Sequence, residues 1–353
     1  MTKSPGHYAP LHHLRQTAFP AFFPSGKWVQ TTILKGGHIH LTALVEWEGP
    51  KGPEKTVFQR LNPSVFPDPE LLAENNAVIV GHLRTHSYPK EILQPMYTPE
   101  GLSLVPAPGG PWRAFPYFSE TYARTQAVDA GEVRKAAAAV GEWHNFLKDL
   151  DPGKIQPAIP RFFDLTHRWG QWEYARQNAL PDRTLHASAE IAQLESGRHL
   201  VDQFERLRES DIFPLRILHG DPKLSNLLFD EKTKEIRAII DWDTVQPGWI
   251  VFDFGDMVRA YTNPCAEDEP DPAGIKIHQP YLDALLDGFL SQTQHWLTPA
   301  ERDHLLTGAQ WVIWTQALRF LADYLIGDRY YPASYPEHSL VRGRNQLKLL
   351  ESF

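Results

Sequence analysis

The sequence predicts an α+β protein in which a small antiparallel sheet with one main helix precedes a larger, mostly helical region. Three observations support this class. Residues 27–62 contain three runs of alternating, β-branched character, separated by Gly- and Pro-rich turns, which is typical of strands. Residues 67–86 have the apolar spacing of a helix, with Pro69 near the start and Glu70 in the first turn. Helical periodicity then dominates, most clearly over residues 130–150.

The remaining elements complete a two-unit organisation. Two more short strands are expected near residues 91–97 and 102–105, and further helices over residues 187–209, 278–296 and 300–326. Between these helices, NLLFD, the turn EKTKE and IRAIID predict a β-hairpin. We therefore expect a small N-terminal nucleotide-binding lobe (1–115), a hinge (116–120) and a larger C-terminal catalytic and substrate-binding lobe (121–353).

Composition and charge limit the class of partner. The chain of 353 residues is 42% hydrophobic and 22% charged, which is ordinary for a soluble globular protein. Its net charge of −8 argues against a nucleic-acid binder, although a few cations and magnesium suffice to hold a nucleotide. The single cysteine and the lack of a signal-peptide-like or membrane-spanning run predict a cytoplasmic protein without a membrane partner. We expect a monomer or a weak homodimer.

The segment from His219 to Asn226 (HGDPKLSN) carries the chemistry. It has the spacing of the protein-kinase catalytic loop, His-x-Asp-x-x-x-x-Asn, with Gly220 in place of Arg. Phosphoryl transfer needs positioning and charge neutralisation, so Asp221 would orient the acceptor hydroxyl and Lys223 would reach the γ-phosphate of ATP. Asn226 would ligate Mg²⁺, and His219 would brace the loop. A coincidental polar turn is disfavoured because the predicted hairpin follows at once.

Two aspartates compete for the second magnesium position. Asp253 lies in Asp-Phe-Gly, the metal-binding triplet of protein kinases. Asp241 ends the strand that pairs with the one starting at Asn226, and an antiparallel ladder brings both to the same end. We therefore assign the metal to Asp241 and a capping or bracing role to Asp253. Asp243 remains either a second metal contact or a substrate contact.

The first unit is expected to bind the nucleotide. Gly36 and Gly37 resemble a phosphate-covering loop between strands. Protein kinases carry Val-Ala-Ile-Lys on the third strand, where this chain has Val-Phe-Gln-Arg, so Arg60 is the candidate phosphate cation and Glu74 its ion partner. The alternative is that Arg60 is a solvated strand residue. The backbone amides of Tyr117 and Phe118 are the candidates for reading adenine.

With these motifs, the chain resembles the aminoglycoside phosphotransferase/choline kinase superfamily, which has a protein-kinase-like fold. Within it, nearly the whole chain is most similar to bacterial N-acetylhexosamine 1-kinases, which phosphorylate the anomeric hydroxyl of N-acetylglucosamine or N-acetylgalactosamine. The catalytic loop marks only the superfamily. The narrower resemblance rests on GGHIH (36–40), VFQRLNPSVFPDPELLAEN (57–75), IIDWDTVQPG (239–248), FDFGDMVR (252–259), CAEDEPD (265–271) and RFLADYLIGDRYYPASYPEHSLVRGRNQL (319–347).

This resemblance implies a sugar substrate held near Asp221 by residues of the second unit. Arg259, Arg319 and Tyr330 are the candidates by position in the matching segments. Each has a simpler alternative: Arg259 would pair with Asp256, Arg319 would be a surface charge, and Tyr330 would be a packed loop aromatic. That branch carries Asn at the position of Gly220 and Leu at that of Trp242, so the sugar preference is expected to differ.

Two other functions remain open. The acidic run Glu267-Asp268-Glu269 would attract a polycationic aminoglycoside, and choline or another amine-bearing alcohol is a related acceptor. A pseudokinase that binds nucleotide without turnover would have lost a catalytic group, yet Asp221, Asn226 and Asp241 are all present. We therefore expect ATP- and Mg²⁺-dependent phosphorylation of a small-molecule sugar.

Overall fold

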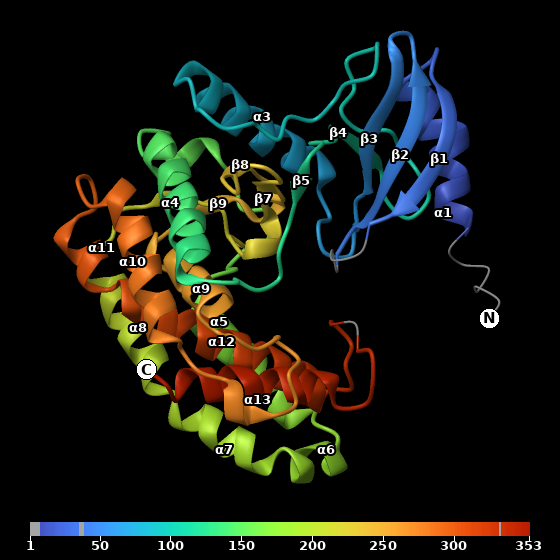
Figure 1. Cartoon of the computed structure of the whole chain (residues 1–353). Coiled ribbons are helices and arrows are strands. Elements are labelled where there is room, and N and C mark those ends of the chain that lie inside the picture. Colours follow the sequence, from blue (N-terminus) through green and yellow to red (C-terminus); the bar gives the residue numbers. More distant parts are fainter. Residues whose placement is uncertain (1–7, 35–38, 332) are drawn as a thin grey trace. The chain divides into compact units, whose positions relative to one another are not determined.

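A computed structural model describes residues 8–34, 39–331 and 333–353 of the chain. The chain forms two compact units, Met1–Thr121 and Tyr122–Phe353, and each is described by itself (Figure 1). The predicted phosphate-covering pair Gly36–Gly37 lies outside the described residues.

The first unit contains one four-stranded antiparallel sheet. Its strands follow the order β1-β2-β3-β4; the register is continuous across β2–β3, with Leu41 opposite Arg60, and across β3–β4, with Gln59 opposite Arg113, and it shifts once in the β1–β2 pair. The elements are β1 (Lys27–Ile33), β2 (Leu41–Gly49), β3 (Gly52–Arg60) and β4 (Trp112–Pro116), with the helices α1 (Tyr8–His13), α2 (Phe19–Phe22) and α3 (Pro69–Thr85).

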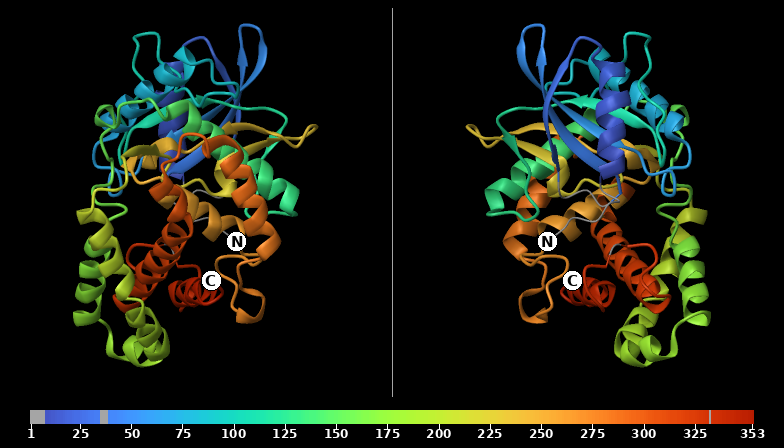
Figure 2. Two further views of the ribbon diagram at one scale, coloured as in Figure 1. Left: turned by 90° about the vertical axis from the view of Figure 1, so that its left-hand side faces the viewer. Right: turned by 90° about the vertical axis from the view of Figure 1, so that its right-hand side faces the viewer.

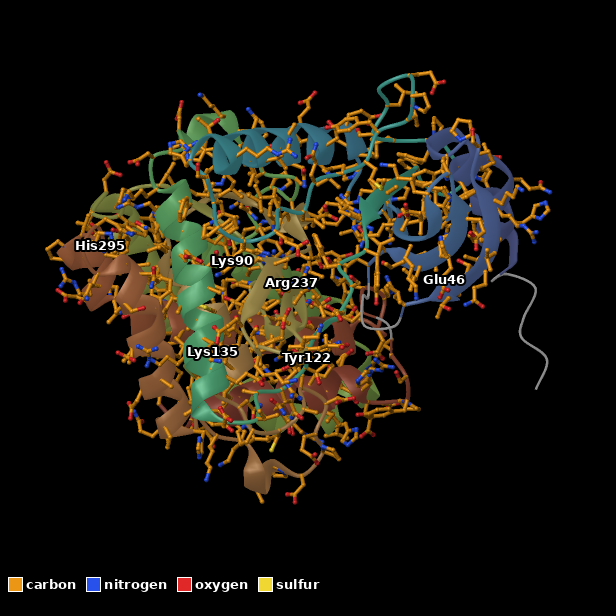
Figure 3. All side chains as sticks on the ribbon, turned by 45° about the horizontal axis from the view of Figure 1, so that its top comes forward. Glu46, Lys90, Tyr122, Lys135, Arg237 and His295 are labelled. Carbon is orange, nitrogen blue, oxygen red and sulfur yellow. The ribbon has the colours of Figure 1, made fainter. Side chains whose placement is uncertain are left out.

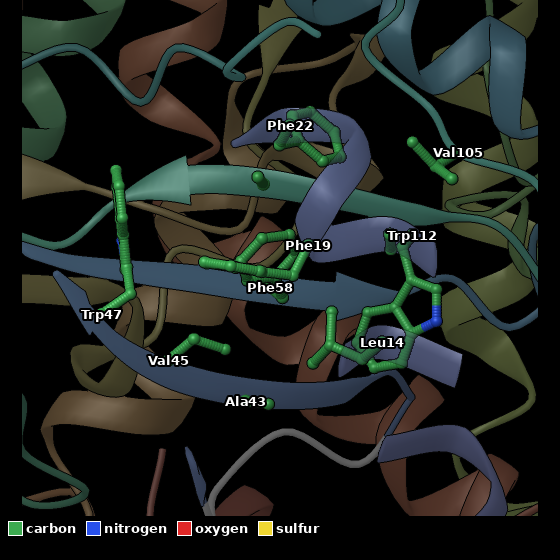
Figure 4. Packing of buried hydrophobic residues seen from close by; sticks show 11 residues of the cluster. Leu14, Phe19, Phe22, Ala43, Val45, Trp47, Phe58, Val105 and Trp112 are labelled. Carbon is green, nitrogen blue, oxygen red and sulfur yellow. The ribbon is translucent and has the colours of Figure 1, made fainter. Parts of the chain in front are cut away.

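The core of this unit lies between one face of the sheet and the N-terminal helical segment (Figure 4). Strand residues of one parity, such as Val45 and Phe58, point into it because successive side chains alternate between the two faces of a sheet. Phe19 and Phe22 of α2 pack against Phe58 with ring centroids 6.3 and 5.7 Å apart. Residues of the opposite parity, including Gln59 and Arg113, therefore belong to the other face of the sheet.

Most of the predicted elements of this unit are confirmed. The three strands and the helix after them form, and Asp68 caps that helix by accepting a hydrogen bond from the backbone N–H of Leu71 at 3.1 Å. The strands predicted near residues 91–97 and 102–105 were wrong. This region forms only isolated bridges, one of them between Val105 and Trp112, because prolines at 95, 99, 106 and 108 cannot donate to a ladder.

The second unit is mostly helical, and its strands are short. The antiparallel pairs are β6–β9 and β7–β8, the latter being the predicted hairpin. Its elements are β5 (Thr121–Tyr122, at the boundary), α4 (Ala130–Leu147), α5 (Leu165–Gln177), α6 (Pro181–His186), α7 (Ser188–Ser196), α8 (His199–Glu209), β6 (Arg216–Leu218), β7 (Leu227–Asp230), β8 (Ile236–Ile239), β9 (Gln246–Gly248), α9 (Val251–Tyr261), α10 (Gln279–Thr293), α11 (Pro299–Asp303), α12 (Leu305–Leu325) and α13 (His338–Leu350).

The helices of this unit surround α12. This helix is buried along most of its length and packs against α5, α9 and α13, while α4 packs against α10 (Figure 1). Helices α12 and α13 also contact α7, and the side views show these segments together (Figure 2). Helices α9 and α12 approach closely because Gly255 faces Gly308: a Cβ at Gly255 would lie 2.5 Å from the Gly308 carbonyl oxygen. This contact fixes α9, which supports the catalytic loop.

The predicted helices of the second unit are present, but two are divided. Residues 187–209 form α7 and α8, and residues 300–326 form α11 and α12. Charged side chains cover the outward side of α4, where Lys135 pairs with Glu235 of the turn after β7 (Figure 3). No helix among the described residues is both long and apolar enough to cross a membrane.

Candidate active site

The catalytic loop connects β6 to β7 and contains a glycine that cannot be replaced without strain. Gly220 has a φ of +84°, which disfavours other residues. A Cβ at this position would lie 2.5 Å from the carbonyl oxygen of Thr244. The Thr244 hydroxyl also donates to the His219 carbonyl at 3.0 Å, so the loop packs tightly on the turn 242–244. In this chain, the departure from Asn is therefore required by the packing of the loop.

Three predicted site residues of the loop lie in direct contact. Lys223 Nζ is 2.6 Å from Asp221 Oδ2, and Asn226 donates through Nδ2 to the backbone oxygen of Asp221 at 2.8 Å and to Oδ2 at 3.1 Å. The carboxylate of Asp221 is thus held in one orientation and is still partly accessible, with its side chain 26% exposed. Such a fixed carboxylate is suited to orienting an acceptor hydroxyl.

Asp241 belongs to the same electrostatic site. Burial opposes the charge of Lys223, but the carboxylates of Asp221 and Asp241 outweigh it and raise the pKa of Lys223 above its ordinary value. Lys223 therefore remains protonated at neutral pH. A fixed positive charge beside Asp221 can stabilise negative charge on a transferred phosphoryl group.

Asn226 and Asp241 are placed as a hairpin predicts. Leu227 pairs with Ile239, and the Ile240 N–H donates to the Asn226 carbonyl at 2.9 Å, so the two candidate ligands lie at the same end of the ladder. Asp241 has a φ of +68°, a strained conformation for a residue other than glycine and one that clusters at functional sites. Because Asn226 uses its Nδ2 on Asp221, its Oδ1 is turned away from that carboxylate.

The donors at this hairpin end fit magnesium. Mg²⁺ prefers oxygen ligands and is typically bound through one or two protein carboxylates, with water and phosphate oxygens completing its shell. Within the described ranges, no group of three or more His, Cys, Asp or Glu side chains could hold a metal ion. Asn226 and Asp241 would therefore hold the ion together with a nucleotide, and the buried Asp243 lies in the adjoining turn.

The buried carboxylate of Asp253 holds the backbone of the catalytic loop in place. This carboxylate, which is fully buried, accepts hydrogen bonds from the backbone N–H groups of His219 at 2.6 Å and Gly220 at 2.9 Å. His144 of α4 places Nε2 3.1 Å from Asp253 Oδ2, as an electrostatic contact rather than an aligned hydrogen bond. These contacts agree with the bracing role predicted for Asp253, and they identify His144 as its buried neighbour.

His219 connects the two halves of the site. Its Nδ1 accepts from the Asp221 backbone N–H at 3.3 Å, so the ring proton resides on Nε2, which donates to the Ile240 carbonyl at 3.1 Å. Tyr261 adds support by donating its hydroxyl to the Pro222 carbonyl at 2.5 Å. The imidazole thus connects the backbone of Asp221 to that of Ile240, the residue before Asp241.

Arg259 and the acidic run form a buried ion network beside the loop. Arg259 pairs with Asp256 at 2.8 Å and with Glu267 at 2.9 Å, and Arg342 binds the second oxygen of Glu267 at 3.0 and 2.5 Å. Although burial opposes it, Arg259 and Arg342 lower the pKa of Glu267, with a smaller contribution from Lys223. Arg259 therefore makes the ion pair foreseen as its simpler alternative, and its contact with a substrate stays a prediction.

Arg319 and Tyr330 lie together in a neighbouring group. The Arg319 guanidinium is 5.9 Å from the ring centroid of Tyr330 and 5.4 Å from that of Tyr331. The Tyr330 side chain is 58% exposed, whereas its backbone is held in place. Buried Asp323 accepts from the backbone N–H groups of Arg329, Tyr330 and Tyr331 at 2.8, 2.8 and 2.9 Å. Asp323 therefore fixes the segment that presents both tyrosines.

The candidates of the first unit are not brought together in this way. The ion pair predicted between Arg60 and Glu74 does not form among the described side chains, and their roles at the nucleotide stay predictions. Arg60 is the last residue of β3 and turns to the Pro108 carbonyl, 3.5 Å away, while Glu74 is on the exposed side of α3. The guanidinium on the other face of the sheet is that of Arg113, which donates through Nε and Nη2 to Gln59 Oε1 at 3.1 and 2.8 Å.

The residues proposed to read adenine lie just after β4. Tyr117 is partly exposed and its ring lies 5.8 Å from Lys55 Nζ, while Phe118 is buried and its carbonyl accepts from the Thr121 hydroxyl at 2.7 Å. Adenine recognition by their backbone amides stays a prediction.

Sequence reasoning missed three residues that organise the site. Asp323, Arg342 and His144 lie on helices, and their partners are 6 to 109 positions away in the chain. The residues 319–347 had been singled out by resemblance only, with no motif that marks Asp323 or Arg342. A carboxylate directly before Tyr-Leu-Ile-Gly (324–327), near the end of a predicted helix, was the one available signal for Asp323.

Comparison with known proteins identifies the family. Residues 30–279, more than half of the chain, match the model of the phosphotransferase enzyme family. The chain belongs to this family and is therefore a phosphotransferase with its kinase-like fold. The narrower similarity to N-acetylhexosamine 1-kinases is not part of this finding.

Solved structures share the fold at low sequence identity. An aminopropanol kinase associated with a microcompartment matches with a TM-score of 0.68 and 18% identity over 96% of both chains. A spectinomycin phosphotransferase solved with ADP and spectinomycin matches with a TM-score of 0.61 and 13% identity over 100% of both chains. An ethanolamine kinase from Plasmodium vivax matches with a TM-score of 0.58 and 12% identity over 98% of this chain and 90% of that chain.

Proposed function

We propose that this phosphotransferase is an ATP- and Mg²⁺-dependent sugar kinase that transfers the γ-phosphoryl group to the anomeric C1 hydroxyl of an N-acetylhexosamine or a related hexose. The observation that carries the proposal is the fixed group of Asp221, Lys223 and Asn226 beside Asp241. These residues meet the requirements of phosphoryl transfer, which depends on positioning and electrostatic stabilisation rather than on a covalent intermediate.

Each residue has a defined role in the proposed reaction. Asp221 orients the acceptor hydroxyl and accepts its proton as the new P–O bond forms and the bond to ADP breaks. Lys223 is kept cationic by its carboxylate neighbours and offsets charge on the transferred group. Asn226 and Asp241 would hold Mg²⁺, which neutralises the phosphate oxygens when bound. His219 and Asp253 keep these groups in register.

The acceptor class is supported by the resemblance of the C-terminal segment and by the state of the acidic run. Attraction of a polycationic aminoglycoside would require free carboxylates in residues 267–269. Both oxygens of Glu267 bind arginines, Asp268 lies 3.5 Å from His338 Nε2, and Glu269 accepts from the Asp271 backbone at 3.0 Å. Only Glu267 is therefore neutralised by cations, whereas Asp268 stays half-exposed; the loss of one of the three carboxylates favours a sugar over a polycationic acceptor.

A substrate screen tests this proposal. ATP consumption would be measured with free sugars that do or do not carry a 2-acetamido group, and with choline, ethanolamine, aminopropanol and an aminoglycoside. We expect turnover with N-acetylhexosamines that Asp221→Asn abolishes. Turnover with the amines alone would show that the acceptor is an amino alcohol or an aminoglycoside and not a sugar. ATP consumption that Asp221→Asn leaves unchanged would refute the mechanism.

A further inference from the structure

Arginine side chains and aromatic rings gather in one part of the second unit. Arg168 and Arg319 lie 5.6 and 5.7 Å from the ring centroid of Phe162, and Arg319 also faces Tyr330 and Tyr331. The Arg342 guanidinium also lies 5.1 Å from the ring centroid of Tyr331. We call these six residues the arginine cluster: Phe162, Arg168, Arg319, Tyr330, Tyr331 and Arg342.

The arginine cluster is linked to the catalytic loop by charge. Arg342 shares Glu267 with Arg259. Burial raises the pKa of Glu267, but Arg259 and Arg342 outweigh it and lower that pKa, with a smaller lowering by Lys223 of the loop. Arg259 in turn pairs with Asp256. The ion pairs of Arg259, Glu267 and Arg342 thus join the cluster to the surroundings of the catalytic loop, and we place the far end of an acceptor oriented by Asp221 along this network.

Among the described residues, two of the three arginines of the cluster have no carboxylate partner, whereas Arg342 pairs with Glu267. Across the described parts of the chain, Arg168 and Arg319 form no ion pair. Arg168 donates to the Phe162 carbonyl at 3.2 and 2.9 Å and to Gln171 at 2.9 Å, and Arg319 donates to Gln316 at 3.2 Å. The nearby carboxylates are occupied: Glu267 by two arginines and Asp323 by three backbone N–H groups.

A second sign of this field is seen at Arg168. Burial, and then the charge of Arg319, lower the pKa of the Arg168 guanidinium to about 10. Because the positive charges of Arg168 and Arg319 repel each other, a site beside them disfavours a third cation. Both arginines are well suited to hydroxyl, carbonyl or carboxylate oxygens, because a guanidinium offers several N–H donors in a planar fork.

We infer that the arginine cluster acts as a charge filter on the acceptor, admitting neutral or anionic polyols and rejecting those that carry an ammonium group. This inference rests on the proposed function, since it concerns the acceptor of that same reaction. Like charges brought together across a binding site lower affinity, and we expect a loss of about tenfold or more for a cationic acceptor. Arg319 is the specificity-determining residue, because it contacts both tyrosines and lacks a carboxylate partner.

The experiment compares sugars that differ by one group. Glucose and glucosamine exchange a hydroxyl for an ammonium at C2, and N-acetylglucosamine provides the neutral amide. Specificity constants are measured at pH 7 for wild type, Arg319→Gln and Arg319→Lys, with Arg302→Gln as a control on exposed α11. A sugar that is not turned over is assayed as a competitive inhibitor of N-acetylglucosamine phosphorylation. We expect wild type, Arg319→Lys and the control to disfavour glucosamine relative to glucose by about tenfold or more, and Arg319→Gln to lose most of this preference.

A pH series on the wild type provides a readout that does not depend on a variant folding. An amine such as that of glucosamine titrates at about pH 8, like an α-amino group. Between pH 7 and 9 the glucosamine-to-glucose ratio should therefore rise towards one, because the sugar loses its charge while the arginines keep theirs.

The outcomes separate the two proposals. Efficient phosphorylation of N-acetylglucosamine with equal use of glucose and glucosamine at pH 7, or an unchanged ratio in Arg319→Gln, would overturn the charge filter and leave the sugar kinase intact. Turnover confined to amine-bearing acceptors would overturn both.

Discussion

The candidate groups of the two units differ in how they are held. In the second unit, Asp221, Lys223 and Asn226 contact one another, and buried Asp253 fixes the backbone beneath them. In the first unit, Arg60 and Glu74 do not meet. A catalytic group must keep its geometry during the reaction, whereas flexible phosphates of a nucleotide tolerate several arrangements of cations. The comparison teaches that motif-derived assignments are dependable where residues bind one another.

Loss of the catalytic carboxylate should have the largest effect. Asp221→Asn keeps the shape of the side chain but removes the base, so we expect kcat to fall by about 10²–10⁴-fold with a small change in Tm. Steady-state kinetics and thermal unfolding would be measured on the same preparation. If the activity of the variant stayed within twofold of wild type, the catalytic role of Asp221 would be wrong, and the contrast between the two units would fail with it.

The bracing carboxylate is the next test. Asp253→Asn leaves one of the two loop N–H groups poorly satisfied and removes the charge facing His144, so we expect unfolding free energy to fall by about 2–4 kcal/mol and kcat to drop as well. Urea unfolding would measure the first effect. Asp283→Asn, on the exposed side of α10, is the control, and equal behaviour of the two variants would contradict the bracing role.

Asp323 tests whether the tyrosine segment belongs to the acceptor site. Asp323→Asn weakens the hold on three backbone N–H groups, at a cost of about 1–3 kcal/mol. We expect KM for the sugar to rise by about tenfold while KM for ATP is unchanged. An equal rise in both constants would indicate general loosening of the unit instead of a positioning role.

Arg60 tests the first unit directly. Because its guanidinium is directed to the Pro108 carbonyl, we expect Arg60→Met to change KM for ATP by no more than about twofold. Nucleotide titration and initial-rate kinetics would provide the value. A tenfold rise would restore Arg60 as a phosphate cation and would break the contrast between the two units.

The smallest expected effect concerns pH. The pKa of Glu267 is lowered from 4.5 in the folded chain, so its contribution to stability is fully present above that value and is lost as pH falls through the lowered pKa. Its side chain is 33% exposed, and solvent screening limits the contribution to about 1 kcal/mol. Glu267→Gln should therefore unfold earlier than wild type at pH 7, and the difference should shrink as the pH is lowered below 4.5. A difference that does not shrink would exclude this ion network as the cause.

Much of this organisation is predictable from sequence, and the remainder has a physical explanation. The hairpin after Asn226 predicts the position of Asp241, because antiparallel pairing fixes which ends meet. The same reasoning predicts that the aspartate of the Asp-Phe-Gly triplet, Asp253, braces the loop and does not bind the metal, and Asp253 does accept hydrogen bonds from the loop backbone. The fold class and the main helices follow from periodicity. Arg60 shows the limit: a strand motif does not determine where the last side chain of the strand turns.

Other features depend on contacts that no local pattern encodes. Asp323 acts on backbone groups of its own segment, but only after the chain has turned at Gly327 and Asp328, both at positive φ. The sharing of Glu267 by Arg259 and Arg342 joins residues 75 positions apart. The need for glycine at position 220 likewise comes from a distant contact, because a Cβ there would meet the Thr244 carbonyl. The charge of the arginine cluster likewise emerges from packing.

Phosphorus NMR of the product tests the central claim most directly. Purified protein would be incubated with ATP, Mg²⁺ and N-acetylglucosamine, with Asp221→Asn as the parallel control. The account predicts a new sugar phosphate whose phosphorus couples to the anomeric proton, formed with ADP and absent from the control. A phosphomonoester at any other position, or the same product from Asp221→Asn, would contradict it.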